Sequence, residues 1–303
     1  MEALFIGHAY IDVTIVAPAI PSGDDKTVAD DYAVSFGGNA VTAAFAYAKL
    51  GGKPDLLATQ ADDWLGRMFE DMARSYRVTL HERKVSRSSL SLVIPNNGKR
   101  AILRMRDDKH LHPFPPLNVG AAKVLHLDGH QQDAALHYAV QARKNGTLVS
   151  LDGGAVRGNT DELLEFVDVA VVAERFCEQM ERTPSEVLHV LRAKGVKVGG
   201  VTMGERGMLW FEGSGPEEHL PALPVPKDLI VDTNGAGDVF HGAYVWAYAQ
   251  DPNAPWSRHF RFARAASAHA IQHLGNEAKL PAVAEVLETA ARYGDPIQGI
   301  MTR

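Results

Sequence analysis

A glycine-rich turn followed by an acidic residue is the part of this 303-residue chain whose residue types could perform chemistry. A short apolar run, residues 229–231, predicts the end of a strand, and the helix-capping residues Asp-Thr-Asn follow it. Gly235, Ala236 and Gly237 then leave backbone N–H groups accessible, and the first N–H groups of a helix can bind an anion. Asp238 adds a proton acceptor at the same place. Phosphoryl transfer to a hydroxyl group needs this combination.

The composition argues against several classes of protein. Apolar residues make up 46% of the chain and charged residues 22%, as in ordinary globular proteins. The net charge of −6 and the lack of a basic cluster argue against binding of nucleic acid. No apolar run approaches the roughly 20 residues that a membrane span requires, and the N-terminus does not resemble a signal peptide. The single cysteine, Cys177, fits a reducing cytoplasm, where we expect the protein.

The order of apolar patterns predicts an α/β protein. Strand-like and helix-like segments alternate from residue 124 to residue 202, a pattern typical of right-handed βαβ units. Further helices are expected over residues 238–250, 257–273 and 281–292. We therefore expect a three-layer, doubly wound, mainly parallel sheet, with residues 1–303 forming a single domain.

Two segments interrupt this alternation, at about residues 10–36 and 86–112. Both contain strand-like alternation, and the Asn-Gly pair near residue 98 predicts a hairpin turn. We expect these segments to form a small antiparallel β lid. Ligands of parallel sheets bind beyond the carboxyl ends of the strands, where such a lid would exclude water. A sheet of this kind leaves an edge or a face that a second copy could cover, so we expect a homodimer formed through the lid.

Several motifs occur in the order found in the ribokinase-like (PfkB) carbohydrate kinases. Residues 37–44 (GGNAVTAA) resemble the first signature of that family, and residues 62–66 (DDWLG) are similar to the element that follows it. Residues 232–243 (DTNGAGDVFHGA) closely match the second signature, and residues 201–207 (VTMGERG) resemble the nucleotide-site strand and turn. The resemblance implies an α/β core with a β lid, ATP and Mg²⁺ as cofactors, and transfer of the γ-phosphate to a sugar hydroxyl.

The resemblance also implies roles for individual residues. Asp238 would be the base for the acceptor hydroxyl, and the residues from Gly235 to Gly237 would form an anion hole. Asp232 resembles part of the loop that binds a monovalent cation such as K⁺. The residues expected to face the sugar are Asp12, Lys26, Gly38, Asn39, Thr42 and Arg104. The residues expected to line the nucleotide are Thr202, Gly204, Gly207 and Asn276.

Two departures from the family pattern bear on the substrate and the metal. Thr42 replaces the asparagine usual in the first signature, so the hydroxyl pattern read on the sugar should differ. Residues 172–176 lack the N-x-x-E element, which leaves Glu174 as the carboxylate for Mg²⁺. A subgroup that includes ketohexokinase and sulfofructose kinase is similar in both departures. Lys26 and Arg104 together would suit an acidic sugar, although residues 126–130 lack the arginine that sulfofructose kinase would need.

Three functions stay open on these grounds. The first is a sugar kinase that acts on a ketose or an acidic sugar derivative. The second is a nucleoside kinase of the adenosine kinase type, against which the polar and cationic lid residues argue, because a purine favours aromatic and aliphatic cover. The third is a non-catalytic sensor of sugar or nucleotide on the same scaffold. Asp238 and the three residues before it argue against the sensor, because a sensor does not need a base.

Overall fold

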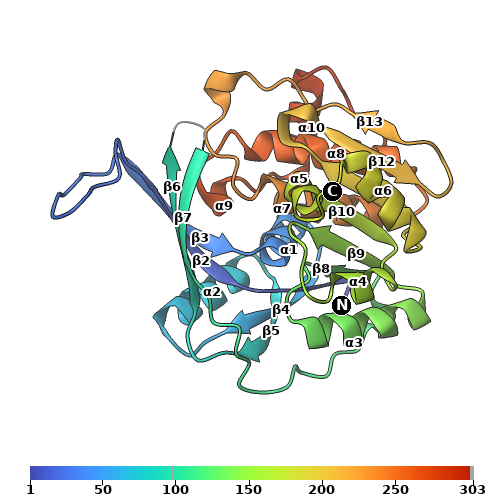
Figure 1. Ribbon diagram of the computed structural model, residues 1–303, viewed down its shortest axis with the longest axis horizontal. Helices are drawn as coiled ribbons and strands as arrows, with labels where there is room; N and C mark the ends of the chain where they lie inside the picture. The colour runs from blue at the N-terminus through green and yellow to red at the C-terminus, as the bar shows by residue number, and fades with distance from the viewer. Residues whose placement is uncertain (97–98, 301–303) are drawn as a thin grey trace.

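The computed structural model describes residues 1–96 and 99–300, which form two sheets of unequal size (Figure 1). In the described residues, the larger sheet has nine strands in the order β13-β12-β11-β10-β9-β8-β1-β4-β5. The strands from β11 to β5 in that order are all parallel to their neighbours, and β12 and β13 are antiparallel additions. The bounds are β1 (Ala3–Gly7), β4 (Pro54–Gln60), β5 (Thr79–Lys84), β8 (Val124–Leu127), β9 (Leu148–Gly153), β10 (Val169–Ala173), β11 (Val198–Thr202), β12 (Met208–Glu212) and β13 (Glu218–Leu220).

Helices cover both faces of this sheet, because alternate residues of its strands enter two separate cores. In β1, Phe5 belongs to one core, whereas Leu4 and Ile6 belong to the other. The first core is closed by α1 (Asn39–Lys49), α2 (Trp64–Ser75), α7 (Ala236–Gln250), α8 (Trp256–Ala270) and α10 (Val283–Arg292). The second is closed by α3 (Gln132–Asn145), α4 (Thr160–Leu164), α5 (Glu174–Gln179) and α6 (Pro184–Ala193). The predicted three-layer α/β fold is therefore confirmed.

The remaining short helices connect these elements. They are α9 (Gly275–Ala278) and the 3₁₀ turns η1 (Val119–Ala121), η2 (Gly204–Arg206) and η3 (Lys227–Leu229). The strand end predicted at residues 229–231 is wrong, because η3 occupies its start and the rest is irregular. The backbone N–H groups of Val231 and Asp232 both bond to the carbonyl of Ile271 instead of to a strand, and all three apolar side chains of this run are exposed. Within the described residues, no helix is long and apolar enough to cross a membrane.

The smaller sheet forms the predicted lid and lies at the left in Figure 1, with segment 17–30 projecting from it. Its order is β3-β2-β6-β7, with bounds β2 (Tyr10–Val16), β3 (Asp31–Gly37), β6 (Ser89–Asn96) and β7 (Lys99–Met105). The β2–β3 and β6–β7 pairs are antiparallel, as expected, but β2 and β6 are parallel. They are parallel because each leads away from the carboxyl end of a strand of the main sheet, β1 or β5. The centre of the predicted Asn-Gly turn, residues 97–98, lies outside the described residues.

The register of the lid gives its two faces opposite characters. Ser35, Asp12, Ser91 and Arg104 are paired across the four strands and form one polar row. In the next row Val34, Val13, Leu92 and Leu103 are paired in the same way. Neighbouring residues of a strand point to opposite faces, so the polar row faces one side of the lid and the apolar row faces the other.

A close approach of α1 and α7 holds the first core together, and we expect Gly242→Ala to disturb it. A Cβ atom at Gly242 would lie 2.3 Å from the carbonyl oxygen of Ala43 and 2.8 Å from the Cβ atom of Ala46. Relief of this clash should lower the free energy of unfolding by about 1–3 kcal/mol, measured by denaturant titration. Gly237→Ala is the matched control in the same helix, because a Cβ atom there meets nothing within 4 Å. An equal loss of stability in both variants would contradict the packing explanation.

Candidate active site

The entry to α7 has the open backbone that the sequence predicts for an anion-binding turn. Gly235 caps the helix with φ of 73°, a left-handed conformation that favours glycine. Gly237 is exposed, and the space around its Cα atom is open. Asp238 follows in the first turn and is half-buried. Donors and an acceptor therefore lie together at the start of a 15-residue helix, where the helix dipole also favours an anion.

Asn276 connects this turn to the lid. Its side-chain amide donates to the Asp12 carboxylate at 3.2 Å and to the carbonyl oxygen of Phe36 at 2.7 Å. On its other side, a Cβ atom placed on Gly235 would lie 2.6 Å from Asn276 Oδ1 and 3.9 Å from Asp238 Oδ2. The sequence prediction placed Asn276 with the nucleotide residues, whereas the structure buries it between Asp12 and the α7 turn. The reason is that α9, which carries Asn276, packs against β3 of the lid.

The polar row of the lid surrounds Asp12 with hydrogen-bonding groups. Asp12 lies between Ser35 and Ser91, and Arg104 donates from Nε to Ser91 Oγ at 3.1 Å. The Arg104 guanidinium also lies 4.6 Å from the centre of the Tyr10 ring, a cation–π distance. Burial raises the pKa of Asp12 above its usual range. The row thus presents one buried carboxylate and one exposed cation on the same face.

The first glycine signature packs tightly against His8, the residue after β1, and against Asp12. Gly38 has φ of 106°, and a Cβ atom there would lie 2.0 Å from the carbonyl oxygen of His8. A Cβ atom on Gly37 would lie 2.4 Å from the Asp12 carboxylate. Thr42 lies one turn further along α1 and is completely buried. These contacts explain why the chain has two glycines here and not only a turn before a helix.

Three buried polar atoms on residues predicted for the site have no hydrogen-bond partner within the described part of the chain. They are Asp12 Oδ1, Thr42 Oγ1 and Asn276 Oδ1. Buried polar atoms are nearly always paired, with protein, water or ligand. A ligand rich in hydroxyl groups could satisfy all three, since two are acceptors and the hydroxyl of Thr42 can both donate and accept.

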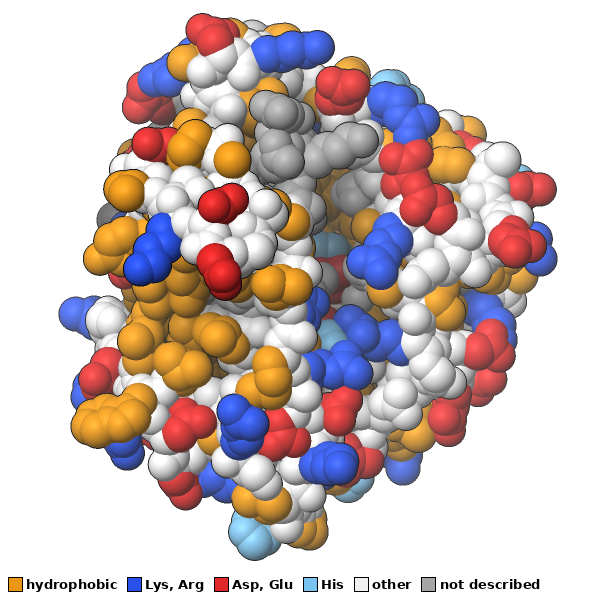
Figure 2. Space-filling view, turned by 60° about the vertical axis from the view of Figure 1, so that its left-hand side comes forward, with side chains coloured by type: hydrophobic (Ala, Val, Ile, Leu, Met, Phe, Trp, Pro, Cys, Tyr) orange, Lys and Arg blue, Asp and Glu red, His pale blue; other side chains and the backbone are white. Residues whose placement is uncertain are grey.

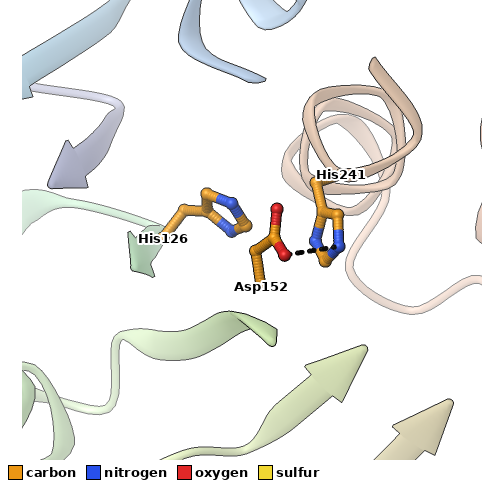
Figure 3. A group of neighbouring side chains, drawn as sticks. All are labelled: His126, Asp152 and His241. Carbon is orange, nitrogen blue, oxygen red and sulfur yellow. Dashed lines mark ion pairs between the residues drawn. The ribbon is translucent and has the colours of Figure 1, made fainter. Parts of the chain in front are cut away.

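His126, Asp152 and His241 form a buried cluster (Figure 3). His241 lies in α7, three residues after Asp238. One ligand atom from each residue lies within 4.8 Å of the others, and His241 Nε2 is 3.6 Å from Asp152 Oδ1. Among the described residues, this set could hold a transition-metal ion, because two imidazoles and a carboxylate suit one. No local spacing pattern in the sequence indicates this cluster, because its members come from β8, β9 and α7.

Hydroxyl groups fix the two imidazoles of this cluster. His126 Nδ1 is 3.0 Å from Ser150 Oγ, and His241 Nδ1 is 2.9 Å from the hydroxyl of Tyr244, which also contacts Ser150. Burial lowers the pKa of both His126 and His241 to about 3, so both rings are neutral at pH 7. Asn39, predicted to face the sugar, donates to Asp152 Oδ2 at 3.1 Å and links the cluster to the first signature.

Three of the four residues predicted for the nucleotide, all except Asn276, lie at or just after the end of β11, next to β10. Thr202 ends β11 beside Ala173 of β10, and Thr202 Oγ1 lies 3.4 Å from the carbonyl oxygen of Val172. Gly204 and Gly207 follow with φ of 58° and 82°. They bound η2, whose Arg206 forms an ion pair with Glu174, the carboxylate predicted for Mg²⁺. The ends of β10 and β11 therefore form a second polar site. Its residues are far in the sequence from the residues of the lid.

Two other predicted residues lie in unexpected surroundings. Lys26 is exposed in the projecting segment 17–30, whereas Arg104 lies in the polar row. Asp232, predicted to bind a monovalent cation, forms an ion pair with the ammonium group of Lys279 instead. Lys279 is completely buried and also donates to the carbonyl oxygen of Asn234. A K⁺ ion at Asp232 does not fit, because a fixed positive charge already takes up the oxygen atoms that would bind it.

Comparison with known proteins identifies the family and the fold. The sequence model of the pfkB family carbohydrate kinases matches residues 2–283. A ribokinase of Haemophilus influenzae is 23% identical over 300 residues, which cover 93% of this chain and 96% of that protein. A solved structure of an Agrobacterium tumefaciens protein, 23% identical, superposes with a TM-score of 0.87 over 96% of this chain and 98% of its own.

A ribokinase of Arabidopsis thaliana, solved in complex with ribose and ATP, is 21% identical and superposes with a TM-score of 0.81 over 95% of this chain and 98% of its own. The predicted family, fold and enzyme class are thus confirmed, while the subgroup with ketohexokinase and sulfofructose kinase stays a prediction. The chain belongs to the pfkB family of carbohydrate kinases, phosphotransferases that use ATP and act on an alcohol group.

Proposed function

We propose that this kinase transfers the γ-phosphate of ATP to a hydroxyl of a small sugar and that Asp238 is the base. The position of Asp238 carries the proposal. It lies in the first turn of α7, directly after the open turn of residues 235–237, and Asn276 separates this turn from Asp12 of the lid. A hydroxyl group held at the lid would therefore reach the carboxylate and the N–H groups at the same time.

In this proposal the acceptor hydroxyl lies between Asp238 and the γ-phosphate. Asp238 orients the hydroxyl and accepts its proton, which moves late if the transition state is loose, so an ordinary ionised aspartate suffices. The N–H groups of residues 235–237 stabilise negative charge on the phosphoryl group as it moves. Low exposure of Asp12, Ser35 and Ser91 in the polar row keeps water from competing with the sugar.

The nucleotide is proposed to lie at the ends of β10 and β11, near Thr202, Gly204 and Gly207. Mg²⁺ bound with ATP would neutralise phosphate charge, and Glu174 would hold its water ligands. The Glu174 side chain is 43% exposed, so it is accessible to a hydrated ion once Arg206 turns away from it. Arg206 is then available to the phosphates of ATP.

The sugar is proposed to be a ketose or an acidic sugar derivative. Asp12 Oδ1, Thr42 Oγ1 and Asn276 Oδ1 would bond to its hydroxyl groups, because each is buried without a partner in the described residues. Arg104 supports an acidic group, because its guanidinium contacts Ser91 and the Tyr10 ring and interacts with the Asp12 carboxylate through charge, which places a positive charge on the polar face. Figure 2 shows a hollow on the lid side of the molecule, with Lys and Arg side chains gathered along it.

We expect Asp238→Asn to lower kcat by about 100- to 10,000-fold, because an amide cannot accept the proton. Sugar binding, measured by calorimetry, should change little. Asp161→Asn is a suitable control, since Asp161 also lies in the first turn of a helix but belongs to α4 and pairs with Lys194. Near-normal turnover of Asp238→Asn at saturating ATP would exclude Asp238 as the base.

A parallel assay of ATP consumption with ketoses, aldoses, sugar acids and nucleosides tests the substrate class. If Arg104 binds an acidic group, Arg104→Gln should lower kcat/KM for a sugar acid by about 10- to 100-fold, because one charge-assisted hydrogen bond is lost. The same substitution should lower kcat/KM for a neutral ketose by a smaller factor. Lys26→Gln tests the second predicted cation in the same assay. Turnover with nucleosides alone would support the nucleoside kinase, and turnover with no acceptor would support the sensor.

We also propose that the protein forms a homodimer through the apolar face of the lid. Leu103 is 67% exposed and Tyr32 is 71% exposed, and they flank the half-buried Val13 and Val34 on that face. Leu103→Asp should therefore give monomers in analytical ultracentrifugation, because it places a charge in the contact. Trp64→Asp, at an exposed tryptophan of α2 outside the lid, should leave the assembly unchanged.

A cytoplasmic location stays a prediction from Cys177.

A further inference from the structure

The buried ammonium group of Lys279 lies at the turn that leads into α7. Lys279 has no exposed surface, and Asp232, its partner, is 7% exposed. The ammonium group also donates to the carbonyl oxygen of Asn234, and Asp232 Oδ1 accepts from the backbone N–H of Asn234 at 2.8 Å. A charge that is removed from water in this way is retained only where partners compensate it closely.

Two of the contacts of this ammonium group are with oxygens of one short loop. A carboxylate oxygen and a backbone carbonyl oxygen converge on the positive charge from residues 232 and 234. Gly235, whose left-handed conformation begins the open turn, is the next residue along the chain. The cation therefore holds together the loop that immediately precedes the anion-binding turn and Asp238.

Lys279 is carried by the same short element as Asn276. Asn276 lies in α9, and Lys279 follows as the residue that ends it. Asn276 bonds to Asp12 of the lid, while Lys279 bonds to Asp232 before α7. The single turn of α9 thus fixes the lid and the catalytic turn relative to each other through two buried side chains.

We propose that the ammonium group of Lys279 is a tethered cation that takes the place of a dissociable monovalent cation, so that this kinase does not depend on K⁺. A cation attached to the chain has no binding equilibrium, so the loop of residues 232–235 stays ordered whatever salt is present. Lys279 is a positioning residue in this proposal, since it acts on the acceptor and phosphate through the loop. The inference rests on the proposed position of phosphoryl transfer at Asp238.

The first test compares the unmodified enzyme in chloride salts of K⁺, Na⁺ and tetramethylammonium at constant ionic strength. We expect turnover with the acceptor found in the substrate screen to differ by less than about twofold among the three salts, and the Tm to be equal in all three. Activation by K⁺ of about tenfold or more, or a rise in Tm specific to K⁺, would show that a cation site exists and would overturn the proposal. The Tm comparison needs no acceptor, so it stands even if the proposed substrate or base is wrong.

The second test removes the ammonium group. Lys279→Ala leaves Asp232 buried without its partner and should lower kcat by about 100-fold, because the turn before Asp238 loses its position. K⁺ or methylammonium, but not tetramethylammonium, should restore a large part of kcat and raise the Tm of the variant, since the vacated space admits only a small cation. Loss of stability without any recovery specific to small cations would show that Lys279 has only a packing role.

Lys197→Ala is the matched control, because Lys197 also pairs with an aspartate, Asp168, but is 69% exposed. Its kcat and Tm should show no difference between K⁺ and tetramethylammonium. If Lys279→Ala does not fold in tetramethylammonium chloride, purification in KCl or methylammonium chloride tests the same recovery. Failure to fold in any salt counts against the tethered cation, since a small cation should replace the missing charge.

Discussion

The hydrogen bond between the Asn276 amide and the Asp12 carboxylate is the contact on which the geometry of the site depends. Both groups are buried, so water cannot compete for the bond, and its loss would take a donor away from a buried carboxylate. Asn276 also donates from its backbone N–H to Ser35 Oγ at 3.2 Å and from its side chain to the carbonyl oxygen of Phe36. Together with these bonds to β3, it links the polar row to the turn that begins α7.

Short elements, rather than the large sheet, perform the final positioning. The sheet and its two helical layers bring β1, β9 and α7 together at one edge of the sheet. Their packing alone does not position the acceptor hydroxyl or the phosphate. From α9, Asn276 contacts Asp12 of the lid and Lys279 contacts Asp232 before α7. The cluster of His126, Asp152 and His241 joins α7 to β8 and β9. The site is thus held by buried polar contacts, each of which is costly to break because its partner cannot be solvated.

Patterns within one segment could be predicted from the sequence, and contacts between distant segments could not. The glycine turn before Asp238, the alternation of strands and helices and the lid all follow from local residue types. The positions of Asn276 and Lys279 depend on how α9 folds back onto the lid. No local hydrophobic periodicity in the sequence indicates this contact. The apolar run at residues 229–231 was misread for a related reason, because hydrophobicity alone does not show that these side chains stay exposed. Resemblance to a family likewise suggested a cation at Asp232 but not the lysine that provides it.

The alternation of the lid strands has a consequence for how this protein can change during evolution. Each residue of the polar row is the backbone neighbour of a residue of the apolar row, as Asp12 is of Val13 and Arg104 is of Leu103. Insertion or deletion of a single residue in one of these strands would exchange the two faces. Substitution in these strands preserves the division between the polar and apolar faces, whereas a change of length by one residue does not.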